Sequence, residues 1–224
     1  MAKSKSTQVT RMLHTAADLR VRESQKEGEE SRTITGYAIL FNTPSVALYD
    51  YDDEEEREVI APSAVTKELL DSCDIKFTMY HNRQIILARS KNGEGTLKYN
   101  VDKKGVSFEF DAPKTVDGDT ALELVRRGDI TGCSFMFRTH YYDSAYVSRN
   151  VERKNGKTVI TYTVNAITDI QDFTLAADPA YPDTSVEAEA RELFSELRKP
   201  SEEKKKRVRE QVREMRSAAG SLNL

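Results

Sequence analysis

The chain has 224 residues, which is enough for one well-packed domain with tails and cramped for two full domains. Hydrophobic residues make up 38% and charged residues 32% of the sequence, a balance that indicates a modest core with polar ends. The 34 Lys and Arg residues nearly match the 37 Asp and Glu residues, so the net charge identifies no class of partner.

Membrane and secretory classes fit the sequence poorly. No apolar run approaches the roughly 20 residues of a membrane span, and the N-terminal residues lack the apolar segment of a signal peptide, so we expect no membrane partner. The two cysteines, Cys73 and Cys133, offer neither a disulfide framework nor metal-ligand spacing. These features indicate a cytoplasmic protein in a reducing compartment.

The first third of the chain combines a polar arm with strand-like segments. Residues 1–15 show no hydrophobic periodicity, so we expect a flexible N-terminal arm. An acidic run at 50–56 is typical of a solvated loop or helix face, and Pro62 suits the first turn of a helix that ends near residue 70. Alternating apolar and polar residues predict strands at 19–21, 32–41 and 74–80. Within the second of these strands, Gly36 indicates a bulge or a close backbone approach.

A hairpin is the clearest local signal in the middle of the chain. Two period-2 runs, 97–101 and 106–110, flank a glycine-containing turn. A short helix fits 119–127, with Asp119 as N-cap and Gly128 just past its end. Further strands are predicted at 130–142, 158–164 and 167–175. The elements together indicate a mainly β fold with α-helices inserted, and a core that is mostly antiparallel.

The last part of the chain has a helical pattern. Pro200 separates a first segment, 186–198, from a second segment that Ser201 can cap. The second segment is basic and has only a thin apolar stripe, so it needs a partner or stays dynamic. The predicted organisation is a flexible arm at 1–15, one β domain at 16–187 and a charged helical C-terminal extension at 188–224.

Histidine is the commonest general base at neutral pH, and the chain has three: His14, His81 and His140. His14 falls in the predicted arm. His140 lies six residues after Ser134 in one predicted strand, which separates them by roughly 20 Å at about 3.3 Å per residue. His81 ends a different predicted strand, and sheet pairing can bring it close to another strand. His81 is therefore the candidate base.

Ser134 stands out as a small polar residue among bulky apolar neighbours. A serine that faces a histidine base can lose its proton as it attacks a carbonyl carbon. Cys133 is also a nucleophile type, but strand alternation places it on the opposite face. The alternative interpretation makes Ser134 a satisfied core hydroxyl and His81 an ordinary residue at a strand end.

Six segments, in this order, carry a resemblance to a known family: 36–42, 58–65, 81–89, 95–108, 127–137 and 172–186. Together they resemble the prohead proteases of tailed phages, which are fold relatives of the herpesvirus assemblins. The segment 81–89 resembles the one that carries the catalytic histidine of the family, and 127–137 resembles the one that carries its serine. The resemblance covers roughly residues 32–187 and implies Ser134 as nucleophile and His81 as general base.

The sequence departs from the family pattern at several positions. Asn82 follows the histidine where the family often has aspartate, and Ala88 and Met136 stand where glycine is usual. We expect Met136 to narrow the site beside the nucleophile. The family carries an acid, commonly glutamate, ahead of its Pro-Ala-Tyr segment, which implies Asp172 as the third catalytic residue. Asp169 is the runner-up, and the alternative interpretation makes Asp172 a solvated acid on a strand.

The resemblance also implies a fold and a function. The expected fold is an antiparallel β-barrel surrounded by short helices, plus the C-terminal helical extension. The expected activity is that of a serine endopeptidase that forms an acyl-enzyme, with no metal or organic cofactor. Its substrates would be extensions of the phage scaffold and major capsid protein, and the protease itself, with self-association as a further option. The place of action would be the assembling prohead in the host cytoplasm.

Two other functions fit parts of the sequence. A non-enzymatic scaffold or assembly module of the prohead would use the domain for docking through the C-terminal helices. Nucleic-acid binding by the basic helix is disfavoured, because glutamates are interspersed with the basic residues and no aromatic residues interleave with them.

Overall fold

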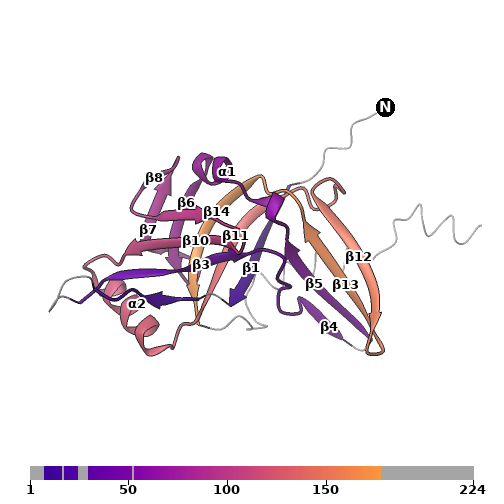
Figure 1. Ribbon diagram of the computed structural model, residues 1–224, viewed down its shortest axis with the longest axis horizontal. Coiled ribbons are helices and arrows are strands. Elements are labelled where there is room, and N and C mark those ends of the chain that lie inside the picture. Colours follow the sequence, from indigo (N-terminus) through magenta and orange to yellow (C-terminus); the bar gives the residue numbers. More distant parts are fainter. Residues whose placement is uncertain (1–7, 17, 25–29, 52, 178–224) are drawn as a thin grey trace, which may run out of the picture. The chain divides into compact units, whose positions relative to one another are not determined.

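The computed structural model describes residues 8–16, 18–24, 30–51 and 53–177. Most of these residues form strands, which are arranged in three sheets (Figure 1). Sheet A has six strands, in the spatial order β1 (Val9–Ala16), β11 (Gly132–Thr139), β14 (Asp169–Ala176), β6 (Asp74–Met79), β7 (Asn82–Lys91) and β8 (Glu94–Gly95).

Sheets B and C have four strands each. Sheet B runs in the order β2 (Arg20–Val21), β3 (Thr33–Leu40), β10 (Gly105–Asp111) and β9 (Lys98–Val101). Sheet C runs in the order β12 (Val147–Lys154), β13 (Lys157–Val164), β5 (Glu54–Ile60) and β4 (Tyr49–Tyr51). Within the described residues, the helical elements are a 3₁₀ turn, η1 (Pro62–Ala64), and two helices, α1 (Lys67–Ser72) and α2 (Val116–Arg127).

The main core lies between sheets A and B. Phe77 on β6 packs against Phe108 and Phe110 on β10, with ring centroids 4.5 and 4.6 Å apart. All three rings are buried, and removing one buried phenylalanine side chain typically costs about 3–5 kcal/mol. This aromatic contact places the two sheets face to face, so one face of sheet A is committed to the core.

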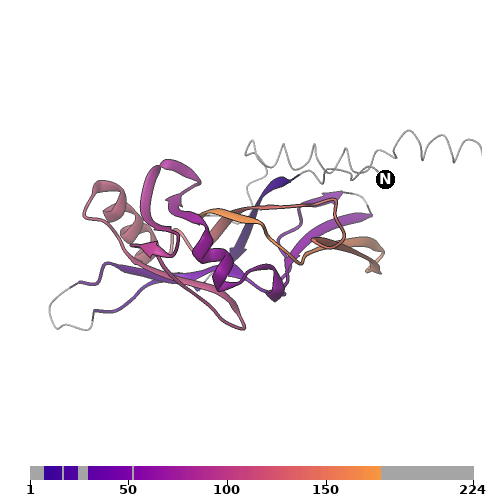
Figure 2. The ribbon, with the colours of Figure 1, turned by 90° about the horizontal axis from the view of Figure 1, so that it is seen from above.

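The expected closed, antiparallel β-barrel is not what the structure has. Among the described residues, no sheet closes on itself, and two strand pairs are parallel: β14 with β6 and β13 with β5. Sheet C lies at the end of the domain opposite to β7 in both views (Figure 1, Figure 2). Alternation along a segment predicts a strand and its two faces, but it carries no information on which distant strand pairs with it or in which direction.

The N-terminal segment is the second correction. Residues 9–16, most of which were predicted to belong to a flexible arm, form β1 and pair antiparallel with β11. Leu13 is buried in the core, and the buried guanidinium of Arg11 donates to Glu58 Oε1 at 2.8 Å. The segment has no clean alternation because a buried arginine takes an interior position, and a partner for that charge is visible only in the tertiary structure.

The acidic run is the third correction. Tyr49–Tyr51 and Glu54–Ile60 form β4 and β5, whereas the sequence predicted a solvated loop or helix face. Glu56 and Glu58 are buried, because their strand lies between β4 and β13 and their side chains face inward. A run of carboxylates normally stays solvated, but pairing with β13 and, for Glu58, the ion pair with Arg11 override that preference here.

Local signals located most other elements. The predicted hairpin is present as β9 and β10, and Gly128 ends α2 in the left-handed conformation with φ 76°. The helix begins earlier than predicted, because the side chain of Thr115, rather than Asp119, accepts the Gly118 N–H and caps it. Pro62 begins only the short η1, and Thr66 caps the separate helix α1. Strand β12 had no sequence prediction.

Gly36 illustrates a close backbone approach. A Cβ atom at this position would lie 3.1 Å from the Asp18 carbonyl oxygen and 3.2 Å from the Leu19 Cα. The neighbouring bulge in β3 lies opposite the step from Val106 to Ser107, not at the glycine. Of the two predicted alternatives, the close approach is therefore the correct one.

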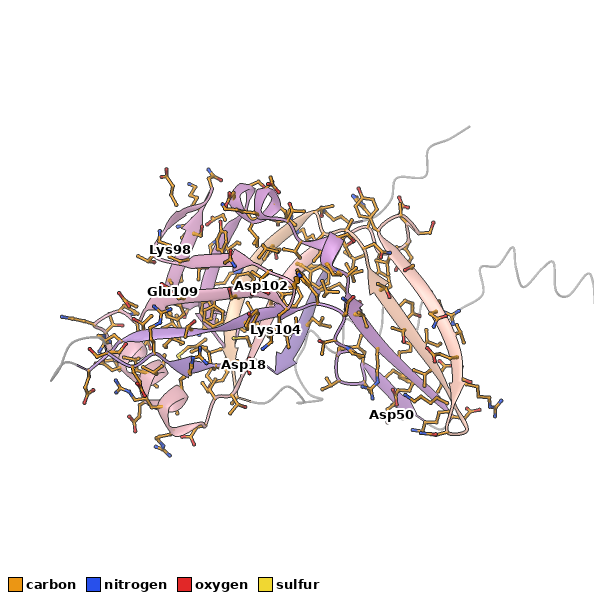
Figure 3. The ribbon with its side chains drawn as sticks, viewed as in Figure 1. Asp18, Asp50, Lys98, Asp102, Lys104 and Glu109 are labelled. Carbon is orange, nitrogen blue, oxygen red and sulfur yellow. The ribbon has the colours of Figure 1, made fainter. Side chains whose placement is uncertain are left out.

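The outer side of sheet B is covered by charges. Lys104 pairs with Asp18 and lies over the Tyr37 ring, whose hydroxyl donates to Asp102 at 2.7 Å (Figure 3).

No helix in the described residues is long and apolar enough to cross a bilayer. The predicted C-terminal extension, 188–224, lies outside the described residues.

Candidate active site

The candidate nucleophile lies in the middle of sheet A. Ser134 is on β11, opposite Thr174 on β14, which is in turn opposite Thr78 on β6. These three hydroxyl residues form one row across adjacent strands and share one face, and all three are buried. We call them the hydroxyl row.

The opposite face of the same strands is apolar. The next residues along each strand, Phe135 and Phe173, are register partners, and Phe173 is in turn the partner of Phe77. Phe77 and Phe173 contact edge to face, with centroids 6.4 Å apart. Because side chains alternate between the faces of a strand, burying these rings directs Ser134 away from the core of sheets A and B. Strand alternation thus fixes the direction of the candidate nucleophile.

His81 occupies a turn rather than a strand end. Met79 and Asn82 are paired at the start of the β6–β7 hairpin, and Tyr80 and His81 form the two-residue turn between them, with φ 54° and 55°. Two-residue hairpin turns favour such left-handed pairs, but usually with asparagine and glycine. Left-handed non-glycine residues cost of order 1–3 kcal/mol each and concentrate at functional sites.

The three predicted side chains are connected by two hydrogen bonds. His81 Nε2 lies 2.8 Å from Ser134 Oγ, and His81 Nδ1 lies 2.8 Å from Asp172 Oδ1. An ionised carboxylate only accepts hydrogen bonds, so Nδ1 carries the proton and Nε2 of the neutral ring accepts from the serine hydroxyl. Both distances are within the range for proton transfer between a nucleophile and its base.

The acid is held rigidly in the interior. Asp172 is on β14, register partner of Met136, and a bulge follows at the step to Ile170. Both Asp172 and Ser134 are 0% exposed, whereas the His81 side chain keeps 13% of its surface accessible. An aspartate, although one methylene shorter than the glutamate usual in the resembling family, therefore reaches the imidazole. In the described part of the chain, Asp172 Oδ2 has no hydrogen-bond partner.

Asp169, the alternative acid, has a different neighbour. Burial raises the pKa of the Cys73 thiol, and the negative charge of Asp169 raises it further. The backbone of Asp169 is the register partner of Arg138, and the imidazole contact belongs to Asp172.

Cys133, the other nucleophile type, and His140 lie apart from this arrangement. Burial raises the pKa of the Cys133 thiol far above its ordinary range, so Cys133 stays protonated on the core face. The His140 ring packs edge-on against Tyr146, with centroids 4.7 Å apart. The backbone of His14 is the register partner of Ser134, in a strand that was not predicted.

Thr174 and Thr78 are site residues that the sequence did not reveal. Thr174 Oγ1 accepts the backbone N–H of His81 at 2.9 Å and the Thr78 hydroxyl at 3.0 Å. A threonine in a strand is what β propensity alone would place there, so no sequence signal distinguishes these two from structural threonines.

No group of three or more His, Cys, Asp or Glu side chains in the described residues is arranged to hold a metal ion. A hydroxyl, an imidazole and a carboxylate in hydrogen-bonded order are instead the parts that nucleophilic acyl transfer uses. The chemistry that this geometry can perform is attack by Ser134 Oγ on a carbonyl carbon, with His81 taking the proton.

Comparison with known proteins agrees with this chemistry. No curated protein and no solved structure matches the chain. Residues 17–199, most of the sequence, match the family described as caudovirus prohead serine protease. The chain therefore belongs to the caudovirus prohead serine protease family.

Proposed function

We propose that this protein is a serine endopeptidase in which Ser134 is the nucleophile, His81 the general base and acid, and Asp172 the residue that orients the imidazole. The observation that carries the proposal is the hydrogen-bonded order of the three side chains, with 2.8 Å at both contacts. The family match supports the reaction class independently of this geometry.

The reaction follows from the protonation states. His81 Nε2 takes the proton of Ser134 as Oγ bonds to the scissile carbonyl carbon, and Asp172 stabilises the imidazolium that forms. The C–N bond then breaks, and the departing amine takes the proton from Nε2, which leaves an acyl-enzyme. Water gives a proton to Nε2 as it attacks the ester, and the same proton returns to Ser134 when the acid product leaves.

The burial of the site affects both electrostatics and access. Asp172 is 0% exposed, so its charge acts on the imidazole through a medium of low polarity, where it is screened less than at the surface. Ser134 is equally buried, so a substrate carbonyl reaches Oγ only after neighbouring groups move. We expect the substrate to bind as an extended segment on the hydroxyl-row face of sheet A.

The substrates that we propose are extensions of the phage scaffold protein, of the major capsid protein, or of both, cleaved inside the assembling prohead in the host cytoplasm. Membership of a prohead protease family supports this assignment. We also propose that the protease cleaves its own chain, and that residues 188–224 dock onto a scaffold or capsid partner. The fold relationship to the herpesvirus assemblins stays a prediction.

Co-expression with the scaffold and capsid proteins of the same phage tests the proposal. Wild-type protein is expected to cleave a partner, and Ser134→Ala is expected to lower the rate about 10⁶-fold, below detection. Cys133→Ala is the matched control, because it changes the adjacent nucleophile type on the opposite face and is expected to keep cleavage. Full-length chain that accumulates only in Ser134→Ala would support self-cleavage.

Two outcomes would overturn the proposal. Cleavage that persists in Ser134→Ala but is lost in Cys133→Ala would transfer the nucleophile to the thiol. If folded wild-type protein cleaves neither partner nor itself and does not react with a fluorophosphonate, the non-enzymatic assembly module becomes the better account.

A further inference from the structure

The turn that carries His81 depends on contacts with the neighbouring strand β14. Tyr80 and His81 are consecutive left-handed residues, with φ 54° and 55°, and neither is a glycine or an asparagine. Both of their backbone N–H groups are bound by β14: Tyr80 donates to the Leu175 carbonyl at 3.1 Å, and His81 donates to Thr174 Oγ1 at 2.9 Å. The second of these contacts is made by a side chain, so a substitution can remove it without breaking the strand.

Thr174 is placed between the base and the nucleophile strand. It is the register partner of Ser134 on one side and of Thr78 on the other, and it is 0% exposed. Its hydroxyl oxygen accepts from His81 and Thr78, and its own proton points to the Leu175 carbonyl oxygen at the long distance of 3.5 Å. An oxygen that accepts two hydrogen bonds in a buried site is strongly constrained in position.

We propose that Thr174 is a positioning residue of the protease: its hydroxyl holds the backbone of His81, so that the imidazole spans Ser134 and Asp172. The inference rests on the proposed function. Asp172 orients the ring from one end, but a ring attached to a strained turn needs its backbone fixed as well. Misplacement of a catalytic group by about 1 Å can lower a rate by about 100-fold.

Thr174→Val tests this role, because valine keeps the β-branched shape and removes the acceptor. We expect kcat/KM for a cleaved substrate, and the rate of labelling by a fluorophosphonate, to fall about 10- to 100-fold. Thr174→Ser keeps the hydroxyl that accepts from His81, so its kcat/KM and labelling rate are expected to stay within about threefold of wild type. The Nδ1–H proton resonance of His81 is expected to stay downfield in Thr174→Ser and to shift or broaden in Thr174→Val.

Two controls separate positioning from general stability. Thr139 is also buried on β11, where its hydroxyl donates to the Ala166 carbonyl at 2.7 Å, away from the three catalytic candidates. Thr139→Val therefore removes a buried hydrogen bond and should leave the labelling rate of the folded protein unchanged. Thr78→Val removes the second hydroxyl but leaves the contact from Thr174 to His81, and should have a smaller effect than Thr174→Val.

Failure of the proposed function and failure of the Thr174 role give different results. If wild-type protein is neither labelled nor active, the proposed function fails. If wild-type protein is active and folded Thr174→Val equals it in rate and in the Nδ1–H resonance, the positioning role of Thr174 is wrong. Should Thr174→Val not fold, Thr174→Cys against Thr174→Ser makes the same comparison, since sulfur is a poor acceptor; equal rates in that pair would also overturn the inference.

Discussion

Sheets A and C each contain one parallel strand pair, but they bury different groups. In sheet A, the hydroxyl row and Asp172 are buried on one face and aromatic rings on the other. In sheet C, β12 buries only Val147, and the buried positions of β5 include two glutamates. Sheet A therefore buries side chains on both of its faces, whereas sheet C has few buried side chains and its outer strand, β12, is mostly exposed.

The difference separates polar groups that are buried at the candidate active site from polar groups that are buried elsewhere. Buried hydroxyls in sheet A bind one another and the imidazole, so each contact also fixes a candidate catalytic atom. The buried charge of sheet C is tied instead to β1, through the ion pair of Arg11 and Glu58. A substitution in the first group should change activity more than stability, and one in the second group should do the reverse.

Among variants that keep the Ser134 nucleophile, Asp172→Asn should have the largest effect on activity. The amide keeps the shape of the side chain but no longer stabilises an imidazolium and can favour the wrong tautomer, so we expect kcat to fall about 10⁴-fold. Measuring kcat with a cleaved substrate tests this prediction, and thermal unfolding shows whether the variant is folded. Asp169→Asn is the matched control, and a larger loss in that variant would exchange the roles of the two acids.

Removal of β1 should have the largest effect on stability. Deletion of residues 2–16 exposes the edge of β11, removes Leu13 from the core and leaves Glu58 buried without Arg11. These losses sum to about 5 kcal/mol or more, comparable to the whole stability of a typical domain. Deletion of residues 2–7 spares the strand and is expected to leave the circular dichroism melt unchanged. If both deletions melt like wild type, β1 is dispensable.

Arg11→Met tests the ion pair that connects β1 of sheet A to the buried Glu58 of sheet C. Breaking a buried ion pair by removing one partner costs about 3–5 kcal/mol, whereas the double variant Arg11→Met/Glu58→Met should lie close to wild type. Arg22→Met is the control, because its pair with Glu109 is nearly half exposed and should contribute less than about 1 kcal/mol. Denaturant unfolding measures all three, and equal losses at Arg11 and Arg22 would contradict the prediction.

The stability lost in Arg11→Met should depend on pH in a defined direction. Burial raises the pKa of Glu58, against the opposing effect of Arg11. The folded state therefore binds a proton more readily than the unfolded state, and stability from this group declines as pH rises from the unfolded pKa through the folded one. Without Arg11 the larger part of this opposition is lost and only the hydrogen bond with Tyr141 still lowers the pKa of Glu58, so the Arg11→Met deficit should be larger at pH 8 than at pH 5. A deficit that shrinks as pH rises would reverse the assignment.

Val151→Thr should have the smallest effect. Val151 is an exposed residue of β12, and threonine has nearly the same shape and strand preference. We expect a change within about 0.5 kcal/mol in unfolding and none in activity. A loss above 1 kcal/mol would show that this face of sheet C is covered in solution.

Much of the site could be predicted from the chain, and the reasons are local. Ser134 and His81 are predicted from residue type, neighbouring motifs and the family resemblance, and Asp172 from its place before the Pro-Ala-Tyr segment. The hydrogen bonds between these side chains agree with that geometry. Thr174 escaped prediction because its contact with the His81 backbone depends on which strand lies beside the turn.

Alternation, turn residues and motif order were sufficient to determine a mainly β chain with short helices, the β9–β10 hairpin and the end of α2. Those properties depend on contacts between residues close in sequence. The tertiary structure alone decided that the sheets formed by the described residues stay open, that β14 runs parallel to β6, and that β1 is a strand. The physical reason is that strand pairing and the burial of a charge such as Arg11 depend on partners dozens of residues away, and a local pattern contains no information on them.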